Sequence, residues 1–243
     1  MADNPERREF LSRGTKASGA AIAISTLNIG TAHASQPIDC PIYTFHGVSS
    51  GAAVERVIRD NDRVGRISLS VKQLGEILLD ERELPDKLPY CLTFDDGLKS
   101  QFDNAVPVLN RYGVEATFFV IAGTMDGSWP GDNVHIYMSQ GQILYLNALG
   151  YEIGSHTVTH RNLVTLFNQR DFGAVEDEIY QSADKLEMVT GQMVTSFCYP
   201  SGFGWNNPFI REAVSNRYKI SASTIPGRIQ SPGAIYALRR VGV

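Results

Sequence analysis

The stretch CLTFDDGLKS, residues 91–100, ends an apolar run in two adjacent carboxylates and a glycine. The run has the composition of a buried strand, whose successive side chains point to opposite faces. A break into a turn at Gly97 lets both Asp95 and Asp96 reach one cavity. An Asp-Asp-Gly sequence alone is more often a solvated turn. In a functional site the two carboxylates would have different tasks, one binding a metal ion and the other held just outside it.

Around this stretch, runs rich in Val, Ile, Tyr, Phe and Thr alternate with segments at helical spacing. The alternation predicts an α/β fold with a mostly parallel sheet, and seven strands can close into a barrel. Ser70 and Ser139 are candidate N-caps, and residues 173–189 predict a long amphipathic helix that ends at Gly191. The predicted strands are 41–46, 90–94, 116–121, 151–155, 194–199, 218–222 and 235–241.

The N-terminal segment 1–34 has the three parts of an export signal and resembles a twin-arginine signal. Arg7 and Arg8 are paired, a weakly apolar middle follows, and Ala32-His33-Ala34 is a small-residue cleavage site. The alternative is a membrane anchor, but polar residues interrupt the apolar part, which falls short of the ~20 residues of a span. We expect cleavage, no membrane span afterwards, and a periplasmic or secreted catalytic domain over 35–243.

Composition limits the remaining classes of protein. The 243 residues are 43% hydrophobic and 20% charged, as in one globular domain. The net charge of −4 argues against nucleic acid and anionic membrane as partners, and no segment indicates an obligate protein partner. The three cysteines, Cys40, Cys91 and Cys198, cannot all pair, and the latter two lie in strand-like runs, where a buried thiol is the common outcome. We expect no disulfide framework.

A second polar strand end is YEIGSHTVTH, in which His160 follows His156 by four residues. In folds of this class ligands lie at the carboxyl ends of the strands. If the residues after Ser155 turn helically, both imidazoles share one face and reach one divalent ion. Two histidines at this spacing are more often a helix surface, and a metal site needs an additional oxygen ligand.

The motifs TFDDG, SHTVTH and FCYPSG, in this order, resemble the first three motifs of the polysaccharide deacetylase family, the NodB-homology carbohydrate esterases of family 4. The resemblance extends over residues 41–243. It implies a distorted (β/α)7-type barrel, the NodB-homology fold. It further implies that Asp96, His156 and His160 hold zinc or a similar ion, while Asp95 is the general base.

Such a site leaves one metal position open for water, which becomes acidic enough for a carboxylate to deprotonate at neutral pH. The resulting hydroxide attacks an acetamide carbonyl, and the resemblance implies that the main-chain N–H of Ser201 helps to stabilise the oxyanion. The ligand set suits Zn²⁺ and also Co²⁺ or Ni²⁺. On the substrate side we treat Tyr199 as packing, and Trp205 as either a sugar platform or a cover of the core edge.

The third motif departs from the family pattern. Many members have Arg-Pro-Pro-Tyr-Gly where this chain has Cys-Tyr-Pro-Ser-Gly, residues 198–202, so the arginine that orients the base is missing. We expect Arg240, in ALRRVGV, to replace it from the last strand. Because strand neighbours alternate faces, Arg239 is the alternative inward residue, and Arg240 could also be a rim residue.

The general acid is a second departure, since many members carry a Leu-x-His motif whose histidine protonates the leaving amine. This chain has no histidine after His160. In a closed barrel the first and last strands are neighbours, and IYTFHGV puts His46 at that corner. This stretch resembles the Tyr-His-x-Val segment of the poly-N-acetylglucosamine deacetylases, which implies that His46 is the acid. A core role for His46, and His135 as the acid, remain alternatives.

The sequence therefore predicts an exported, metal-dependent hydrolase that removes N-acetyl groups from the amino sugars of a glycan. Two other hypotheses remain open. A metal amidase acting on a non-sugar amide would use the same carbonyl chemistry. A catalytically dead glycan-binding homologue would explain the missing arginine and histidine, although the retained carboxylates and histidine pair argue against it.

Overall fold

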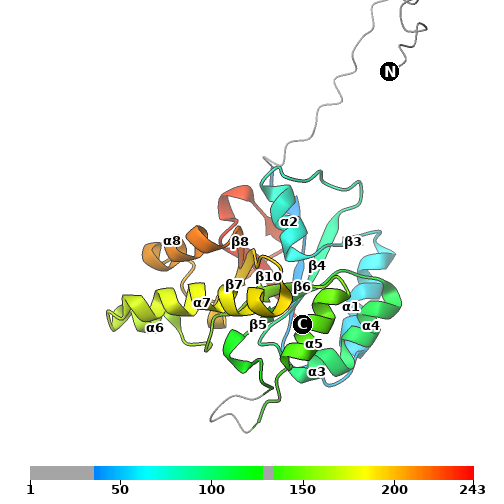
Figure 1. Cartoon of the computed structure of the whole chain (residues 1–243). Coiled ribbons are helices and arrows are strands. Elements are labelled where there is room, and N and C mark those ends of the chain that lie inside the picture. Colours follow the sequence, from blue (N-terminus) through cyan, green and yellow to red (C-terminus); the bar gives the residue numbers. More distant parts are fainter. Residues whose placement is uncertain (1–35, 128–133) are drawn as a thin grey trace, which may run out of the picture. The chain divides into compact units, whose positions relative to one another are not determined.

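Seven parallel strands close into a barrel in the computed structural model, which describes residues 36–127 and 134–243 (Figure 1). The strand β2 pairs with β4 on one side and with β10 on the other, so the sheet has no free edge between its first and last strands. The order around the barrel is β2, β10, β8, β7, β6, β5, β4. The strands are β2 (Ile42–Phe45), β4 (Pro89–Phe94), β5 (Thr117–Val120), β6 (Glu152–Ser155), β7 (Ser196–Cys198), β8 (Ile220–Pro226) and β10 (Leu238–Gly242).

Each strand overlaps a strand predicted from the sequence, and the predicted (β/α)7-type barrel is confirmed. The expected export signal over 1–34 lies outside the described residues, as do positions 128–133. Three short strands lie beside the barrel: β3 (Ile67–Ser68) extends the edge of β4, and β1 (Ile38–Asp39) pairs antiparallel with β9 (Ile229–Gln230).

Most helices in the connections between strands cover the outside of the barrel (Figure 1), whereas α2 (Val71–Leu78) packs against residues of its interior. Ser70 and Ser139 each form a capping box, and Gly191 ends the longest helix in a left-handed conformation, all as predicted. The helices are α1 (Ala52–Arg63), α2 (Val71–Leu78), α3 (Lys99–Asn104), α4 (Val106–Tyr112), α5 (Gln140–Ala148), α6 (Leu163–Asn168), α7 (Phe172–Thr190) and α8 (Pro208–Arg217), with 3₁₀ turns η2 (Ala122–Thr124), η3 (Pro200–Gly202) and η4 (Pro232–Ala234).

The strand β4 shows how the fold positions the site. Its even-numbered residues, such as Leu92 and Phe94, pack in the core between the sheet and the helices. Cys91 instead belongs to a second core, built from residues of β2, β4, β5, β7, β8 and β10 together with α2, which is the barrel interior. Asp95 continues the inward set, so the strand delivers this carboxylate to the inside of the barrel.

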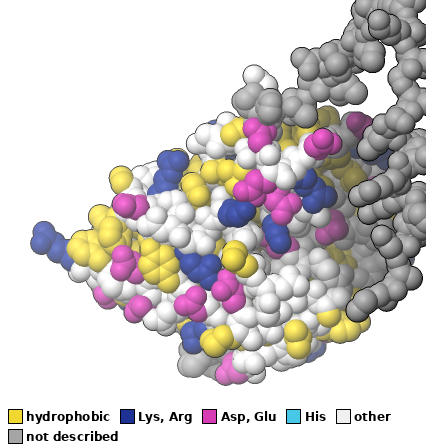
Figure 2. All heavy atoms as spheres, turned by 45° about the horizontal axis from the view of Figure 1, so that its top comes forward, with side chains coloured by type: hydrophobic (Ala, Val, Ile, Leu, Met, Phe, Trp, Pro, Cys, Tyr) yellow, Lys and Arg dark blue, Asp and Glu magenta, His cyan; other side chains and the backbone are white. Residues whose placement is uncertain are grey.

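The three cysteines Cys40, Cys91 and Cys198 are buried free thiols, as expected for the latter two. Among the described residues, no helix combines the length and the apolar character needed to cross a membrane. On the face drawn in Figure 2, the visible acidic and basic side chains are interspersed.

Candidate active site

Asp95 lies at the carboxyl end of β4, with only 1% of its surface exposed. Its main-chain N–H donates to the carbonyl of Phe45 at 2.9 Å, which ties it to β2. The Nη1 atom of Arg240 lies 2.8 Å from both carboxylate oxygens, and Arg240 Nε donates to the Ser223 carbonyl at 2.6 Å. Arg239 points outward and is exposed. Of the two arginines, Arg240 is therefore the one that contacts the predicted base.

Arg240 keeps its positive charge at this buried position. Burial works against the guanidinium, but the carboxylate of Asp95 outweighs burial and raises the pKa of Arg240 above its ordinary value. A charged arginine inside the barrel needs this partner, because an unpaired buried charge is strongly unfavourable.

The extended backbone of β4 ends at Asp96, the residue directly after Asp95. Its φ is 74° and that of Gly97 is 73°, so two consecutive residues adopt the left-handed conformation, which aspartate tolerates better than most residues. The break begins at Asp96, one residue earlier than the sequence predicts. As a result Asp95 stays inside the barrel, while Asp96 turns to the end of the barrel where the histidines lie.

Asp96, His156 and His160 form a cluster with the spacing of a metal site. Asp96 Oδ1 lies 3.4 Å from His156 Nε2 and 3.6 Å from His160 Nε2. A four-coordinate ion with bonds of about 2.0–2.2 Å separates its donor atoms by about 3.4 Å, so both distances from Asp96 suit a single ion. All three donor atoms lie within 4.8 Å of one another. The three predicted ligands therefore fit a divalent metal.

The backbone fixes the orientation of His156. Its Nδ1 lies 2.8 Å from the carbonyl oxygen of Cys198, the usual outer contact of a metal-binding histidine, and its Nε2 faces Asp96. The two imidazole rings lie 4.8 Å apart at 66°.

The expected helical turn between the two histidines is wrong. Residues after Ser155 form a loop in which Thr157 and His160 have φ of 67° and 53°, and the next helix begins only at Leu163. The histidines converge because two left-handed residues fold the loop back on itself. The spacing of four residues is thus compatible with a shared site for a different geometric reason.

The charges in the cluster favour the metal-binding forms of Asp96 and His160. Around His156 they favour the protonated form instead: burial acts to lower the pKa of His156, but Cys198 and the carboxylate of Asp96 raise it well above its ordinary value. Burial acts to raise the pKa of Asp96, but the hydrogen bond to His156 and the neighbouring imidazoles lower it below its ordinary value. Burial and the charge of His156 lower the pKa of His160. A carboxylate and a neutral imidazole are the protonation states that coordinate a metal ion.

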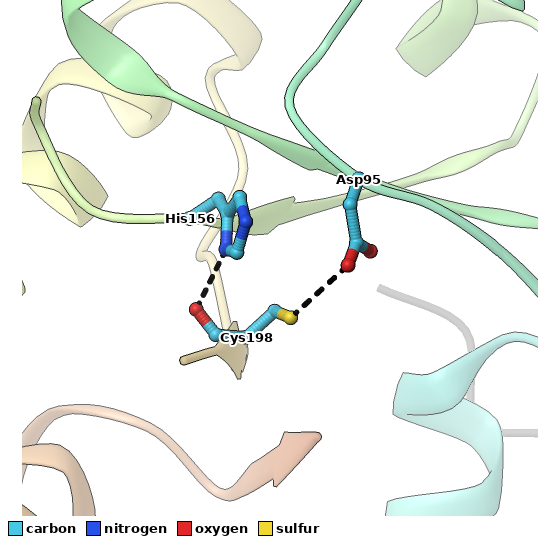
Figure 3. A group of neighbouring side chains, drawn as sticks. All are labelled: Asp95, His156 and Cys198. Carbon is cyan, nitrogen blue, oxygen red and sulfur yellow. Dashed lines mark hydrogen bonds between the residues drawn. The ribbon is translucent and has the colours of Figure 1, made fainter. Parts of the chain in front are cut away.

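Cys198 links Asp95 to His156 (Figure 3). Its thiol donates to Asp95 Oδ2 at 3.6 Å, and its carbonyl oxygen contacts His156. Asp95, His156 and Cys198 also meet the spacing of a metal site. However, Arg240 already engages both Asp95 oxygens, and the Nδ1 of His156 faces a carbonyl, so this second group is a hydrogen-bonded support. The sequence predicted only a buried thiol here; the signal was the cysteine in place of the motif arginine.

His46 follows β2 and lies at the edge of the same site. Its Nε2 is 3.9 Å from Asp95 Oδ2, and 60% of its side chain is exposed. His135 lies in the segment before α5, where its ring centroid is 6.4 Å from that of Tyr137. The structure therefore brings His46 to the base while leaving the ring accessible to solvent.

The third motif forms the turn after β7. Ser201 is exposed with φ of 54°, and Gly202 follows with φ of 74°. A Cβ on Gly202 would lie 1.9 Å from Thr224 Oγ1, so only glycine fits. Tyr199 is completely buried and donates its hydroxyl to the Tyr236 carbonyl at 3.2 Å, as expected of a packing residue. Trp205 is partly buried against the core between the sheet and the helices.

Comparison with known proteins adds to this geometry. A family model described as polysaccharide deacetylase matches residues 83–221, more than half of the chain. The chain belongs to the polysaccharide deacetylase family. It is therefore a hydrolase of carbon–nitrogen bonds other than peptide bonds. Members of this family generally depend on a divalent metal.

Among curated relatives of this polysaccharide deacetylase, the protein YxkH of Bacillus subtilis (strain 168) is 28% identical over 218 residues, which cover 86% of this chain and 72% of YxkH. A chitin deacetylase of Pestalotiopsis sp is 32% identical over 117 residues, 48% of this chain and 35% of the relative.

Solved structures share the fold. IcaB from Ammonifex degensii has a TM-score of 0.75 at 23% identity, and the Streptococcus pyogenes deacetylase PplD in complex with acetate has 0.72 at 23% identity. Each comparison covers 86% of this chain and 93% of the other.

Proposed function

We propose that this chain hydrolyses the N-acetyl groups of amino sugars in a glycan and leaves a free amine and acetate. The observation that carries the proposal is the arrangement of Asp95 beside the cluster of Asp96, His156 and His160. One buried carboxylate is held by an arginine, and the adjacent carboxylate points to two imidazoles. These are the two parts that metal-assisted amide hydrolysis requires: a base and an ion site next to it.

Asp96, His156 and His160 would hold the ion, with zinc as the first expectation and cobalt or nickel compatible with the same ligands. A divalent ion supplies Lewis-acid chemistry: it lowers the pKa of a water molecule and polarises an amide carbonyl. Both effects act on the substrate side of the cluster, next to Asp95.

The remaining steps belong to the side chains and the backbone of this chain. Asp95 takes the proton of the attacking water, and Arg240 fixes the orientation of that carboxylate. The main-chain N–H of Ser201 donates to the oxyanion as the carbonyl becomes tetrahedral. His46, close to the base and open to solvent, gives a proton to the leaving nitrogen.

We infer that the protein acts outside the cytoplasm. The twin-arginine-like segment over 1–34 supports export, and its cleavage would release the domain over 35–243. An N-acetylated glycan of the cell envelope or its surroundings is then the accessible partner. The net charge of −4 is compatible with a neutral polymer.

A metal amidase acting on a non-sugar amide remains the second candidate, because base, ligands and oxyanion donor recognise the carbonyl and not the sugar. A dead binding module is disfavoured by the intact pair of Asp95 and Arg240, since the arginine missing from the third motif has a substitute in contact with the base.

The test is acetate release from N-acetylglucosamine oligomers of β-1,4 and β-1,6 linkage, with and without chelator and added zinc. We expect release that chelator abolishes and zinc restores, and that Asp95→Asn abolishes with metal still bound. Zinc-loaded protein that releases no acetate from either series, but cleaves simple N-acetyl amides, would favour the amidase. Glycan binding without any hydrolysis would favour the binding module.

A further inference from the structure

Glu178, on α7, aims a buried carboxylate at the loop between the two histidines. The residue is only 5% exposed. Its Oε2 accepts the main-chain N–H groups of Val158 and Thr159 at 3.0 and 2.8 Å, and its Oε1 accepts the Thr159 hydroxyl. Hydrogen bonds to an ionised carboxylate are stronger than those between neutral groups. One side chain from a separate element therefore holds three donors of the loop.

The loop needs such support because its backbone is strained. Thr157 and His160 both have left-handed φ values, 67° and 53°, and a β-branched residue rarely adopts this conformation. Strained backbone persists only where the surroundings over-determine it. The N–H of His160 donates to Thr157 Oγ1 at 3.0 Å, which closes the loop locally.

The neighbouring elements hold the other side of the loop. The N–H groups of Ala122 and Gly123 in η2 donate to the carbonyls of Thr157 and Val158 at 2.9 and 2.8 Å. Loop carbonyls are thus fixed by η2 and loop N–H groups by Glu178. Without Glu178, the two peptide units would be held on their carbonyl side alone.

The helix that carries Glu178 is itself anchored to the strand before the loop. Ser182, one turn further along α7, lies 2.7 Å from Ser155 through their hydroxyl oxygens. α7 has an Asp171 N-cap and a Gly191 C-cap, so both ends are defined. Glu178 and Ser182 therefore tie the residues on both sides of His156 to one rigid helix.

We propose that Glu178 is a positioning residue of the metal site, which sets the affinity for a divalent ion by holding His160 in register with Asp96 and His156. The inference rests on the proposed metal-dependent function. Glu178 contacts the loop backbone and Thr159 and acts on the ion only through the loop conformation. Partners behind the ligands of a metal site typically change affinity about 10- to 100-fold when they are removed.

A matched control lies on the same helix. Glu187 also accepts a main-chain N–H, that of Val194 at 2.8 Å, and pairs with Arg217 at 2.7 Å, but it does not contact the histidine loop. Glu178→Ala and Glu187→Ala each remove a carboxylate that bonds the backbone. A purely structural role for Glu178 predicts that the two variants behave alike.

The experiment compares wild type, Glu178→Ala, Glu178→Gln and Glu187→Ala. The dissociation constants of Zn²⁺ and Co²⁺ are measured by competition with a chromophoric chelator, and hydrogen exchange of residues 156–160 is followed in metal-free protein. We expect Glu178→Ala to raise both constants about 10- to 100-fold and to speed exchange in the loop. Glu178→Gln keeps an acceptor for the two N–H groups and should lie between Glu178→Ala and wild type. Glu187→Ala should leave both readouts within about twofold of wild type.

Unchanged metal affinity in Glu178→Ala, with wild type binding normally, overturns the inference and leaves the proposed function intact. Wild-type protein that binds neither ion overturns both. Should Glu178→Ala fail to fold, Glu178→Asp carries the same test, because it withdraws the carboxylate by one methylene and keeps its charge. Equal losses of affinity in Glu178→Ala and Glu187→Ala would also overturn the positioning role.

Discussion

Arg240 Nη1 lies 2.8 Å from each carboxylate oxygen of Asp95, although the two residues are 145 positions apart. Both side chains are at most 4% exposed. The barrel makes this contact possible because β10 lies beside β2, which in turn pairs with β4. The predicted base is therefore oriented by a residue from the far end of the described chain.

The first prediction concerns this buried ion pair. Arg240→Met leaves Asp95 as an unpaired buried charge and should lower the free energy of unfolding by about 3–5 kcal/mol. Asp95→Asn in the same chain removes that charge and should restore part of the loss. Urea denaturation of wild type, both single variants and the double variant measures the effect. A loss of stability in the double variant equal to the sum of the losses in the two single variants would show that the two side chains are not coupled.

The second prediction separates the two adjacent carboxylates. Asp95→Asn should lower kcat about 10²- to 10⁴-fold, the usual contribution of a general base, while metal content stays unchanged. Asp96→Asn should instead lower the metal content itself. Acetate release and elemental analysis of the same preparations measure both effects. Loss of metal in Asp95→Asn would assign that residue to the ion.

The third prediction concerns the acid. His46→Ala should lower the rate on an N-acetyl amide about 10²-fold or more, because the amine leaves poorly without a proton. The same variant should cleave p-nitrophenyl acetate at nearly the wild-type rate, because p-nitrophenolate leaves without being protonated. His135→Ala is the matched control and should leave both rates unchanged. If His135→Ala loses amide hydrolysis and His46→Ala keeps it, the assignment to His46 is wrong.

The fourth prediction concerns Ser201, whose φ of 54° suits glycine. Ser201→Gly keeps the main-chain N–H, so kcat should stay within about twofold, and relief of the left-handed conformation should add about 1 kcal/mol of stability. Gly202→Ala is the contrasting variant, because a Cβ there would meet Thr224. It should lose both stability and activity. A large loss of kcat in Ser201→Gly would indicate a role for the hydroxyl.

The fifth prediction concerns pH and Glu152, at the other end of β6. Burial raises its pKa above the ordinary value despite hydrogen bonds from Thr117 and the Lys72 backbone. Folding therefore favours the protonated form, which stabilises the protein at low pH and is lost as pH rises through the folded-state pKa. Glu152→Gln should gain stability relative to wild type as pH rises. Denaturation between about pH 4 and 8 measures this, with exposed Glu83→Gln as the control. A difference in unfolding free energy between Glu152→Gln and wild type that does not change with pH would contradict this prediction.

Local composition predicted the barrel well. Short apolar runs rich in Val, Ile, Tyr, Phe and Thr mark the seven strands, and Ser70, Ser139 and Gly191 mark helix ends, so local chemistry alone locates these elements. The strand β10 begins at Leu238, later than predicted, because residues 235–237, which follow the 3₁₀ turn η4, form a turn and a bend. Such a boundary depends on tertiary contacts that a single sequence does not show.

The site was predictable in its residue types and less so in its geometry. A spacing of four suggested a helical turn from His156 to His160, but the left-handed Thr157 depends on support from Glu178 and η2. Glu178 gave one signal: it is a charged residue three positions after Val175, on the helix face that also carries Ser182. Its partners, 20 residues away, could not be inferred without the fold.

The position of Arg240 also bears on how relatives of this enzyme should be compared. A comparison of motif letters alone records Cys198 where many family members have an arginine. In space, a guanidinium supplied by β10 contacts the carboxylate of Asp95, the predicted base. A closed barrel thus lets a strand distant in sequence bring a charge to the end of β4, and comparisons within such families are safer when made on atomic positions than on motif letters.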